Sequence, residues 1–280
     1  MSIKRNKNVD EIKMLIAETN RRLGIIHKGG GKKKLEKLSS QGKLSARERV
    51  KLLLDLNTRS FEIGAFSAEG MYENYGGAPA AGVVVVMGKV KDRMCIIVAN
   101  DPTVKAGAWF PMTAKKNLRA QELAMENRIP ILYLVDSAGV FLPMQDEIFP
   151  DKEHFGRIFR NNAVMSSHGI PQLSAVMGPC VAGGAYLPIM SDESIIVEET
   201  GSIFLAGSYL VKAAIGEDID NETLGGAISQ TQISGVIDHK VKNDEEAILT
   251  LRGIVDKLGE TSKAGFSRNA SLDPLNQDKL

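Results

Sequence analysis

The chain has 280 residues with 43% hydrophobic and 25% charged side chains, an ordinary composition for a soluble globular protein of one large domain or two small ones. Its net charge of +1 excludes a general attraction to nucleic acid or membrane surfaces. No apolar run is long enough to span a bilayer, and the opening stretch MSIKRNKNVDEIK lacks the hydrophobic segment of a secretory signal.

Charge is distributed unevenly along the chain. Residues 1–51 contain 15 Lys and Arg against 5 Asp and Glu, a net of +10, so the remainder carries −9. A basic arm of this kind can contact phosphate groups or an acidic partner. A solvated helical arm explains the same charges equally well, so both interpretations stay open.

The two cysteines, Cys95 and Cys180, lie far apart in the sequence. Their separation matches neither a metal site nor a disulfide framework, which indicates a reducing compartment. We therefore expect the cytoplasm, or the mitochondrial matrix if the source is eukaryotic, although no transit peptide is recognisable.

The N-terminal region predicts two helices separated by a glycine-rich break. Residues 9–26 are amphipathic, and residues 45–55 form a second helical pattern with Ser45 as a plausible N-cap. Between them, GGGKKK at 29–34 is predicted to be a flexible basic break. It does not match a phosphate-binding P-loop, because no strand precedes it.

From residue 83 onward, apolar strands alternate with helices. GVVVVMGKV and MCIIVAND flank Lys91-Asp92-Arg93 and predict a hairpin. Further along, the predicted strands are 94–99, 131–135 and 173–177, and the predicted helices are 113–128 and 153–167. This alternation indicates an α/β fold with parallel strand pairing.

Each predicted strand ends in a polar or glycine-rich loop, where parallel α/β folds place their chemistry. In GPCVAGGAYLP (178–188), Gly183 and Gly184 follow a strand and leave unpaired amides at the start of a predicted helix. Two such donors can stabilise a developing oxyanion, and the loop Ser137–Val140 is the natural source of a second donor. The alternative is a tight turn in which glycine allows close helix–strand packing.

Four side chains near these loops are weaker candidates. Cys180 is either a nucleophile or a buried inert thiol, and Asp136 is either an acid–base group or an acceptor of loop amides. The pair Asp146-Glu147 is either a metal ligand or part of a solvated loop. Lys105 is either a phosphate contact or an ordinary surface lysine. In each case the second interpretation is the commoner one.

Six segments together resemble the β subunit, the carboxyltransferase component, of biotin-dependent acyl-CoA carboxylases, over roughly residues 20–260. They are GKLSARERVKLLLD (42–55), IVANDPTVKAGAWFP (97–111), KKNLRAQELAMENRIPILYLVDSAG (115–139), GPCVAGGAYLPIMSDESIIV (178–197), GSIFLAGSYLVKAAIGE (201–217) and LGGAISQTQISGVIDH (224–239). The segment FPDKEHFGRIFRNNAVMSS (149–167) most resembles the 3-methylcrotonyl-CoA and geranyl-CoA branch. One departure is AGVFLP after Ser137, where methylcrotonyl-type members often have GGANLP.

The resemblance implies a crotonase-like α/β fold, a spiral of β-β-α units preceded by a helical arm. It divides the chain into a basic helical arm (1–56), a carboxyltransferase N-domain (57–262) and a linker stub (263–280) toward a second half. Family members have two such halves, and the active site lies between the N-half of one subunit and the C-half of another.

The implied reaction moves a carboxyl group from carboxybiotin to an acyl-CoA, with 3-methylcrotonyl-CoA of leucine degradation as the expected substrate. Biotin supplies the base, so the protein supplies placement and oxyanion stabilisation. The backbone donors carried over are Gly183, Gly184, Gly139 and Val140, and the acyl-CoA contacts are Ala138, Ala185 and Lys105. No metal is implied.

Neither an AMKM biotinyl-lysine motif nor a glycine-rich ATP-binding motif is present. We therefore expect no covalently bound cofactor, and we place carboxybiotin on a partner carrier domain. The expected partners are a biotin carboxylase and biotin carrier α subunit, further copies of the β subunit, and acyl-CoA, with no nucleic acid and no membrane.

Several alternatives stay open. The chain is also compatible with a half-length, non-catalytic CoA-binding or assembly module. Related enzymes that act on propionyl-CoA or geranyl-CoA, or that form part of a decarboxylase complex, share the same motifs. A stand-alone crotonase-type hydratase or isomerase is disfavoured, because no pair of catalytic carboxylates lies in the two loops.

Overall fold

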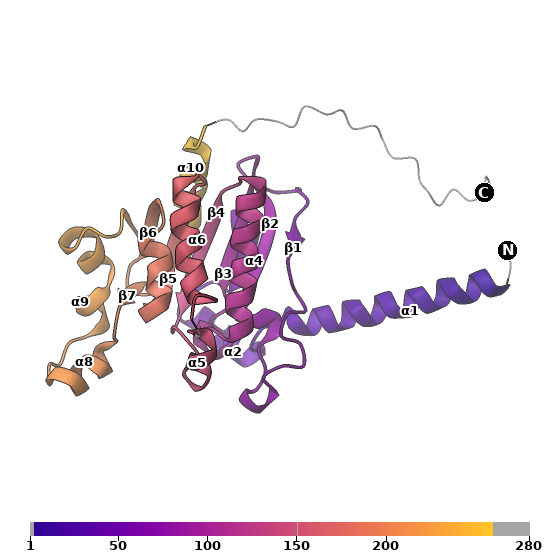
Figure 1. Cartoon of the computed structure of the whole chain (residues 1–280), viewed down its shortest axis with the longest axis horizontal. Coiled ribbons are helices and arrows are strands. Elements are labelled where there is room, and N and C mark those ends of the chain that lie inside the picture. The colour runs from indigo at the N-terminus through magenta and orange to yellow at the C-terminus, as the bar shows by residue number, and fades with distance from the viewer. Residues whose placement is uncertain (1–2, 150, 260–280) are drawn as a thin grey trace.

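The computed structural model describes residues 3–149 and 151–259, and the predicted linker at 263–280 lies outside them. Its centre is an eight-stranded sheet in the order β1-β2-β3-β4-β5-β6-β8, with β7 paired to β5 (Figure 1). The strands are β1 (Phe61–Glu62), β2 (Val83–Val90), β3 (Arg93–Asn100), β4 (Ile131–Ser137), β5 (Gln172–Val181), β6 (Glu193–Val197), β7 (Ser202–Phe204) and β8 (His239–Val241). The pairs β1–β2 and β2–β3 are antiparallel, and every later pair is parallel.

Helices cover both faces of this sheet. The longer ones are α1 (Ile3–Ile26), α2 (Lys32–Ser40), α3 (Ala46–Leu53), α4 (Pro111–Asn127), α6 (Phe155–Ser167), α8 (Ser208–Ile215) and α10 (Asp244–Lys257). The short ones are α5 (Gln145–Ile148), α7 (Tyr186–Ile189) and α9 (Asn221–Gly225). Among the described residues, no helix has both the length and the apolar character needed to cross a membrane.

The core consists of two apolar layers, one on each face of the sheet. Side chains of α4 and α6 pack with one face, and those of α3 and α10 pack with the other. Successive side chains of a strand point to opposite faces, so Val83 and Val85 join the first layer while Val84 and Val86 join the second. The strands buried on both faces are accordingly continuous apolar runs.

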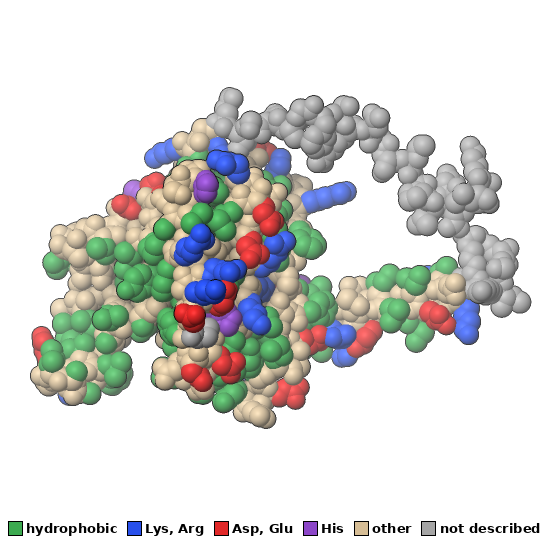
Figure 2. Space-filling model, viewed as in Figure 1, with side chains coloured by type: hydrophobic (Ala, Val, Ile, Leu, Met, Phe, Trp, Pro, Cys, Tyr) green, Lys and Arg blue, Asp and Glu red, His purple; other side chains and the backbone are tan. Residues whose placement is uncertain are grey.

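Two segments extend away from this body. Helix α1 projects on one side, and α8 and α9 project on the opposite side (Figure 1). Figure 2 shows hydrophobic side chains gathered over the second projection. The exposed ones include Leu205, Tyr209, Leu210, Ile215, Ile233 and Val236. Apolar patches of this kind on a folded protein mark surfaces that contact another chain.

The predicted elements between 83 and 167 are confirmed to within about two residues, as expected for boundary errors. The hairpin turns at Lys91 and Asp92, both of which have positive φ. Asp55 stabilises that turn, because its carboxylate accepts hydrogen bonds from both backbone amides. The predicted N-cap Ser45 is also confirmed, and Glu48 completes a capping box with it.

The predicted flexible break at 29–34 is wrong, because the lysines begin helix α2. Gly31 precedes the helix with φ of 95°, a conformation that other residues rarely adopt. Leu38 is buried against the body and holds the helix there. Gly30 is required by packing, since a Cβ at this position would lie 1.9 Å from the carbonyl oxygen of Thr103.

Candidate functional site

The two loops singled out in the sequence meet at the carboxyl ends of β4 and β5. Ser137 pairs with Cys180 in the parallel register of these strands. Gly139, with φ of 89°, packs against the next turn so closely that a Cβ there would lie 3.1 Å from the carbonyl oxygen of Val181. The structure therefore brings the Ser137–Val140 loop and the Gly183-Gly184 turn together.

An irregularity in β5 creates this arrangement. Val135 pairs with Val176 but Ser137 pairs with Cys180, so β5 has extra residues opposite Asp136. Such a β-bulge bends a strand and redirects the chain beyond it. Gly178 lies in the bulge, and a Cβ at this position would lie 1.9 Å from Oδ1 of Asp136. Only glycine therefore leaves room for the Asp136 carboxylate.

The glycine turn is a 3₁₀ segment, Ala182–Ala185, followed by the single helical turn α7. In the i→i−3 pattern of this segment the Gly184 amide faces the carbonyl of Val181, whereas the amides of Ala182 and Gly183 have no acceptor inside the segment. Gly184 has open space beside it, since the nearest atom to an added Cβ would be Ser137 Oγ at 4.0 Å. Helix α7 has only one turn and so contributes little macrodipole. The free amides of the turn would therefore act on a ligand directly.

The Gly139–Val140 loop is held by a bridge to the segment after β3. The amide of Trp109 donates to the carbonyl of Gly139 over 2.8 Å, and the amide of Phe141 donates to the carbonyl of Trp109 over 2.8 Å. In such a parallel bridge the peptide groups of Val140 point away from Trp109. The Val140 amide therefore takes no part in this bridge.

Ser137 was named in the sequence only as the first residue of the loop, and the structure gives its side chain a role there. Its hydroxyl donates to the carbonyl of Gly107 over 2.7 Å and accepts from the amide of Gly139 over 3.1 Å. It therefore joins the loop to the strand-end segment of β3. The available signal was a hydroxyl two residues before a glycine at a strand end, a common turn pattern.

A lysine-lined pocket of about 340 Å³ opens beside this loop. Lys34 and Lys37 of α2 contribute to one wall together with Lys43. Its other lining residues include Ala106, Ala138 and Pro179, from three strand-end segments. Helix α2 and Lys43 of the basic arm thus lie at the carboxyl end of the sheet.

The predicted acyl-CoA contacts occupy different environments. Ala138 lines the lysine pocket, and its amide donates to the carbonyl of Ala106 over 3.0 Å. Lys105 is exposed in the neighbouring segment, whereas Ala185 is buried behind the glycine turn. Their roles in binding stay predictions.

Aromatic rings flank the glycine turn on its other side. A Cβ on Gly183 would lie 3.1 Å from Phe149 Cζ and 3.6 Å from a ring carbon of Phe155. These two rings stack with their centroids 5.0 Å apart, and Phe159 continues the cluster to Tyr186. The turn therefore lies between a polar, amide-rich side and an apolar wall.

The remaining sequence candidates do not supply acid–base or nucleophilic chemistry. Cys180 is fully buried, and burial raises the pKa of its thiol, so the nucleophilic thiolate is disfavoured. Asp136 binds Lys43 and Arg49 rather than loop amides, so the predicted interpretation as an amide acceptor is wrong. Asp146 and Glu147 are exposed, and no cluster of three or more potential metal ligands occurs in the described part of the chain.

Residues 37–279 match the family described as the carboxyl transferase domain. The chain belongs to the carboxyl transferase domain family. The chain is 50% identical over 265 residues to the biotin-dependent 3-methylcrotonyl-coenzyme A carboxylase beta1 subunit of Mycobacterium tuberculosis, covering 95% of the chain and 50% of that protein. It is 49% identical to the probable mitochondrial methylcrotonoyl-CoA carboxylase beta chain of Drosophila melanogaster, covering 93% of the chain and 45% of that protein. The chain thus spans about half the length of the curated relatives it matches.

Solved structures agree with this assignment. Transcarboxylase 12S, with methylmalonyl-coenzyme A and methylmalonic acid bound, superposes on this chain with a TM-score of 0.80 at 30% identity. The match covers 87% of this chain and 47% of that one. The predicted crotonase-like α/β fold is therefore confirmed.

Proposed function

We propose that the chain is the N-terminal half of a carboxyltransferase subunit that moves a carboxyl group from carboxybiotin to an acyl-CoA, with 3-methylcrotonyl-CoA as the preferred substrate. The observation that carries this proposal is the meeting of the Ser137–Val140 loop and the Gly183-Gly184 turn at the ends of β4 and β5, where the first amides of the 3₁₀ turn have no acceptor inside their own segment. Such a pair of loops is suited to a thioester oxygen that gains negative charge.

The residues present indicate which steps the protein would perform and which biotin would perform. The backbone amides would hold the thioester oxygen as the enolate, or a dienolate, forms, and each donor in such a site contributes a few kcal/mol. Biotin, carried by a partner chain, would supply both the carboxyl group and the base. This explains why the loops offer fixed amides and a buried inert thiol rather than an acid–base side chain.

Acyl-CoA binding is supported by the pocket next to the loop. The pocket is lined by Lys34, Lys37 and Ala138, so the anionic end of a CoA ester can lie against positive charge, while the charge of the third lining lysine, Lys43, is balanced by Asp136. Lys105 is exposed beside this pocket and would add to its field. Ala185 would support the glycine turn from behind.

The expected acyl group is branched and unsaturated. Support comes from the two named methylcrotonyl-type relatives, which are about half identical to the chain, and from the Phe149 and Phe155 rings against Gly183. An apolar wall favours a bulky hydrocarbon group over a small one. Propionyl-CoA, geranyl-CoA and a decarboxylase reaction are the alternatives within the same family.

We further propose that the chain works with a biotin carboxylase and biotin carrier subunit, in an oligomer of β subunits, in the cytoplasm or the mitochondrial matrix. The exposed apolar side chains of the α8–α9 projection support contacts with another chain (Figure 2). A second candidate is a module that binds CoA or assists assembly without catalysis.

A carboxylation assay with the biotin-bearing partner, across a panel of acyl-CoA esters, tests the proposal. We expect turnover with 3-methylcrotonyl-CoA to exceed that with propionyl-CoA. The reverse preference would contradict the proposed substrate. Saturable acyl-CoA binding without carboxylation, measured by calorimetry, would favour the non-catalytic module.

A further inference from the structure

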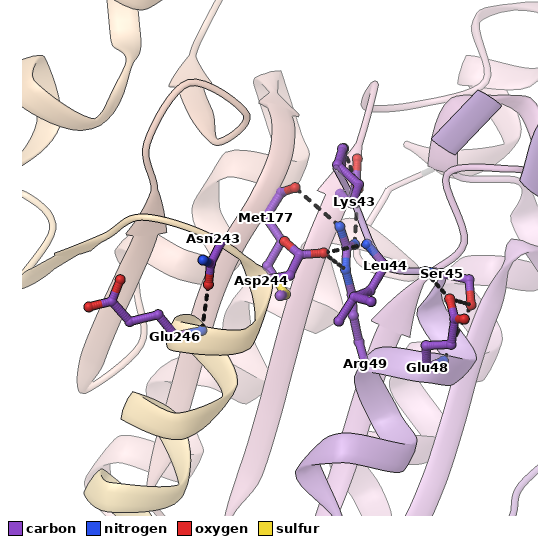
Figure 3. Close-up of polar contacts among 10 residues, drawn as sticks. Lys43, Leu44, Ser45, Glu48, Arg49, Met177, Asn243, Asp244 and Glu246 are labelled. Atoms are coloured by element: carbon purple, nitrogen blue, oxygen red, sulfur yellow. Dashed lines mark hydrogen bonds and ion pairs between the residues drawn. The ribbon is translucent and has the colours of Figure 1, made fainter. Parts of the chain in front are cut away.

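We propose that Arg49 is a positioning residue, which sets the spacing between the two loops by clamping the end of β4 to the bulge in β5. The proposal rests on the proposed function, since it concerns the donors of that same site. Figure 3 shows the Arg49 side chain among its partners. Arg49 is fully buried, which is unusual for an arginine and requires that each part of its guanidinium be paired.

The guanidinium joins four elements of the fold. From α3, its Nη1 contacts Oδ2 of Asp136 at the end of β4 over 3.0 Å, and its Nη2 donates to the carbonyl of Met177 in β5 over 3.3 Å. Its Nε donates to Oδ2 of Asp244 at the start of α10 over 2.8 Å. The planar fork of arginine reaches these three acceptors at once, which a single ammonium group cannot do.

Two further contacts complete the cluster. Lys43 Nζ lies 2.7 Å from Oδ2 of Asp136, and the amide of Leu44 donates to Oδ2 of Asp244 over 2.9 Å. Two cations thus face two carboxylates, all nearly removed from solvent. Balanced charge is what allows such a cluster to persist inside a protein.

The positions of these contacts link the clamp to the proposed site. Asp136 immediately precedes Ser137 and the loop that contains Gly139 and Val140. Met177 lies opposite it in the bulge, before the turn that contains Gly183 and Gly184. Because the bulge interrupts the ladder, Arg49 replaces the missing strand-to-strand contacts. A shift of either strand end would move one set of amides relative to the other.

Arg49→Lys tests this role, with Arg47→Lys as the matched control. Arg47 lies on the same helix and makes a two-pronged ion pair with Glu62, away from both loops. In the assembled carboxylase we expect Arg49→Lys to lower kcat by about tenfold or more while KM for the acyl-CoA changes little, because a displacement of about 1 Å can cost up to a hundredfold. Arg47→Lys should leave kcat unchanged.

Hydrogen exchange of the purified chain gives a readout that does not depend on turnover. We expect Arg49→Lys to accelerate exchange at the amides of segments 137–141 and 180–185, and Arg47→Lys to leave these segments unchanged. Equal exchange and equal kcat in the two variants would overturn the proposal. If the unaltered carboxylase transfers no carboxyl group, the proposed function fails, and the exchange comparison still decides the role of Arg49.

A milder variant is available if Arg49→Lys does not fold. Asp244→Asn keeps an oxygen for Arg49 Nε but removes the charge that holds it. Exchange at 137–141 and 180–185 should rise, and kcat should fall by about threefold, equivalent to roughly 0.6 kcal/mol. Unchanged exchange in folded Asp244→Asn would count against the clamp.

Discussion

The hydroxyl of Ser137 accepts a hydrogen bond from the amide of Gly139 over 3.1 Å. The same hydroxyl donates to the carbonyl of Gly107 over 2.7 Å, so one side chain ties the loop after β4 to the segment after β3. The Gly139 amide is therefore already engaged, whereas the Val140 amide points away from Trp109 and takes no part in the bridge. This relationship makes Val140 the stronger donor candidate of the two.

Ser137→Ala removes both of these hydrogen bonds and leaves the Gly139 amide and the Gly107 carbonyl unpaired. We expect stability to fall by about 1–3 kcal/mol and carboxylation to fall by about tenfold, because the loop loses its anchor. Urea unfolding and steady-state kinetics check the two effects. Ser174→Ala is the control. Ser174 is as buried as Ser137 but lies on β5, and its hydroxyl makes only a 3.5 Å contact with the carbonyl of Pro188. Equal activity in both variants would exclude a role for Ser137 in the site.

Gly184→Val places a branched side chain beside the proposed oxyanion donors. The backbone at Gly184 does not have positive φ, and the nearest atom to a new Cβ is Ser137 Oγ at 4.0 Å, so the fold should tolerate the change. We expect carboxylation to fall by about a hundredfold or more, as for the loss of an oxyanion-hole donor. Cys180→Ala, four residues earlier, should retain most of the activity. Similar modest losses in both variants would indicate a packing role for the glycine turn.

The two cysteines should be unreactive in the folded protein. Both are buried, and burial raises the pKa of Cys95 to about 12 and that of Cys180 further. A thiol reagent reacts with the thiolate, so we expect no labelling at pH 8 without denaturant and labelling of both residues in urea. Fast native labelling of Cys180, read by mass spectrometry, would reopen the nucleophile hypothesis.

Lys116 should make stability depend on pH. Its side chain is buried, its Nζ donates to the carbonyls of Ala80 and Val83, and burial lowers its pKa from 10.5 to about 7. Between these two values the unfolded chain binds a proton that the folded chain lacks, so stability rises as pH increases from about 7 toward 10.

Urea unfolding at pH 7 and pH 9 measures this effect. A single group contributes at most about 1.4 kcal/mol per pH unit. We expect Lys116→Met to remove much of the rise that the unaltered chain shows. The exposed neighbour Lys115 provides the control, and Lys115→Met should keep the rise. An identical pH dependence in all three proteins would contradict the assigned pKa.

Local patterns in the sequence determined most of the strands, helices and turns around the site. Alternation of apolar runs with helical periods identified β3, β4, β5, α4 and α6, because burial of one face or of both faces imposes these periods. Ser45 and Glu48 identified the start of α3, since a capping box involves residues only three apart. The glycines and the strand ends likewise located both loops.

Tertiary structure alone decided what those loops contact. Arg49 and Asp244 are 195 residues apart in the chain, and Arg49 and Asp136 are 87 apart, so no local pattern relates them. The helix at Lys32–Ser40 was missed for the same reason, because its glycine-rich start is stabilised by packing against Thr103. Side-chain and backbone propensities act over one or two turns of chain. The partners of a buried charge depend instead on which distant segments share the interior, where desolvation forces each charge to be paired.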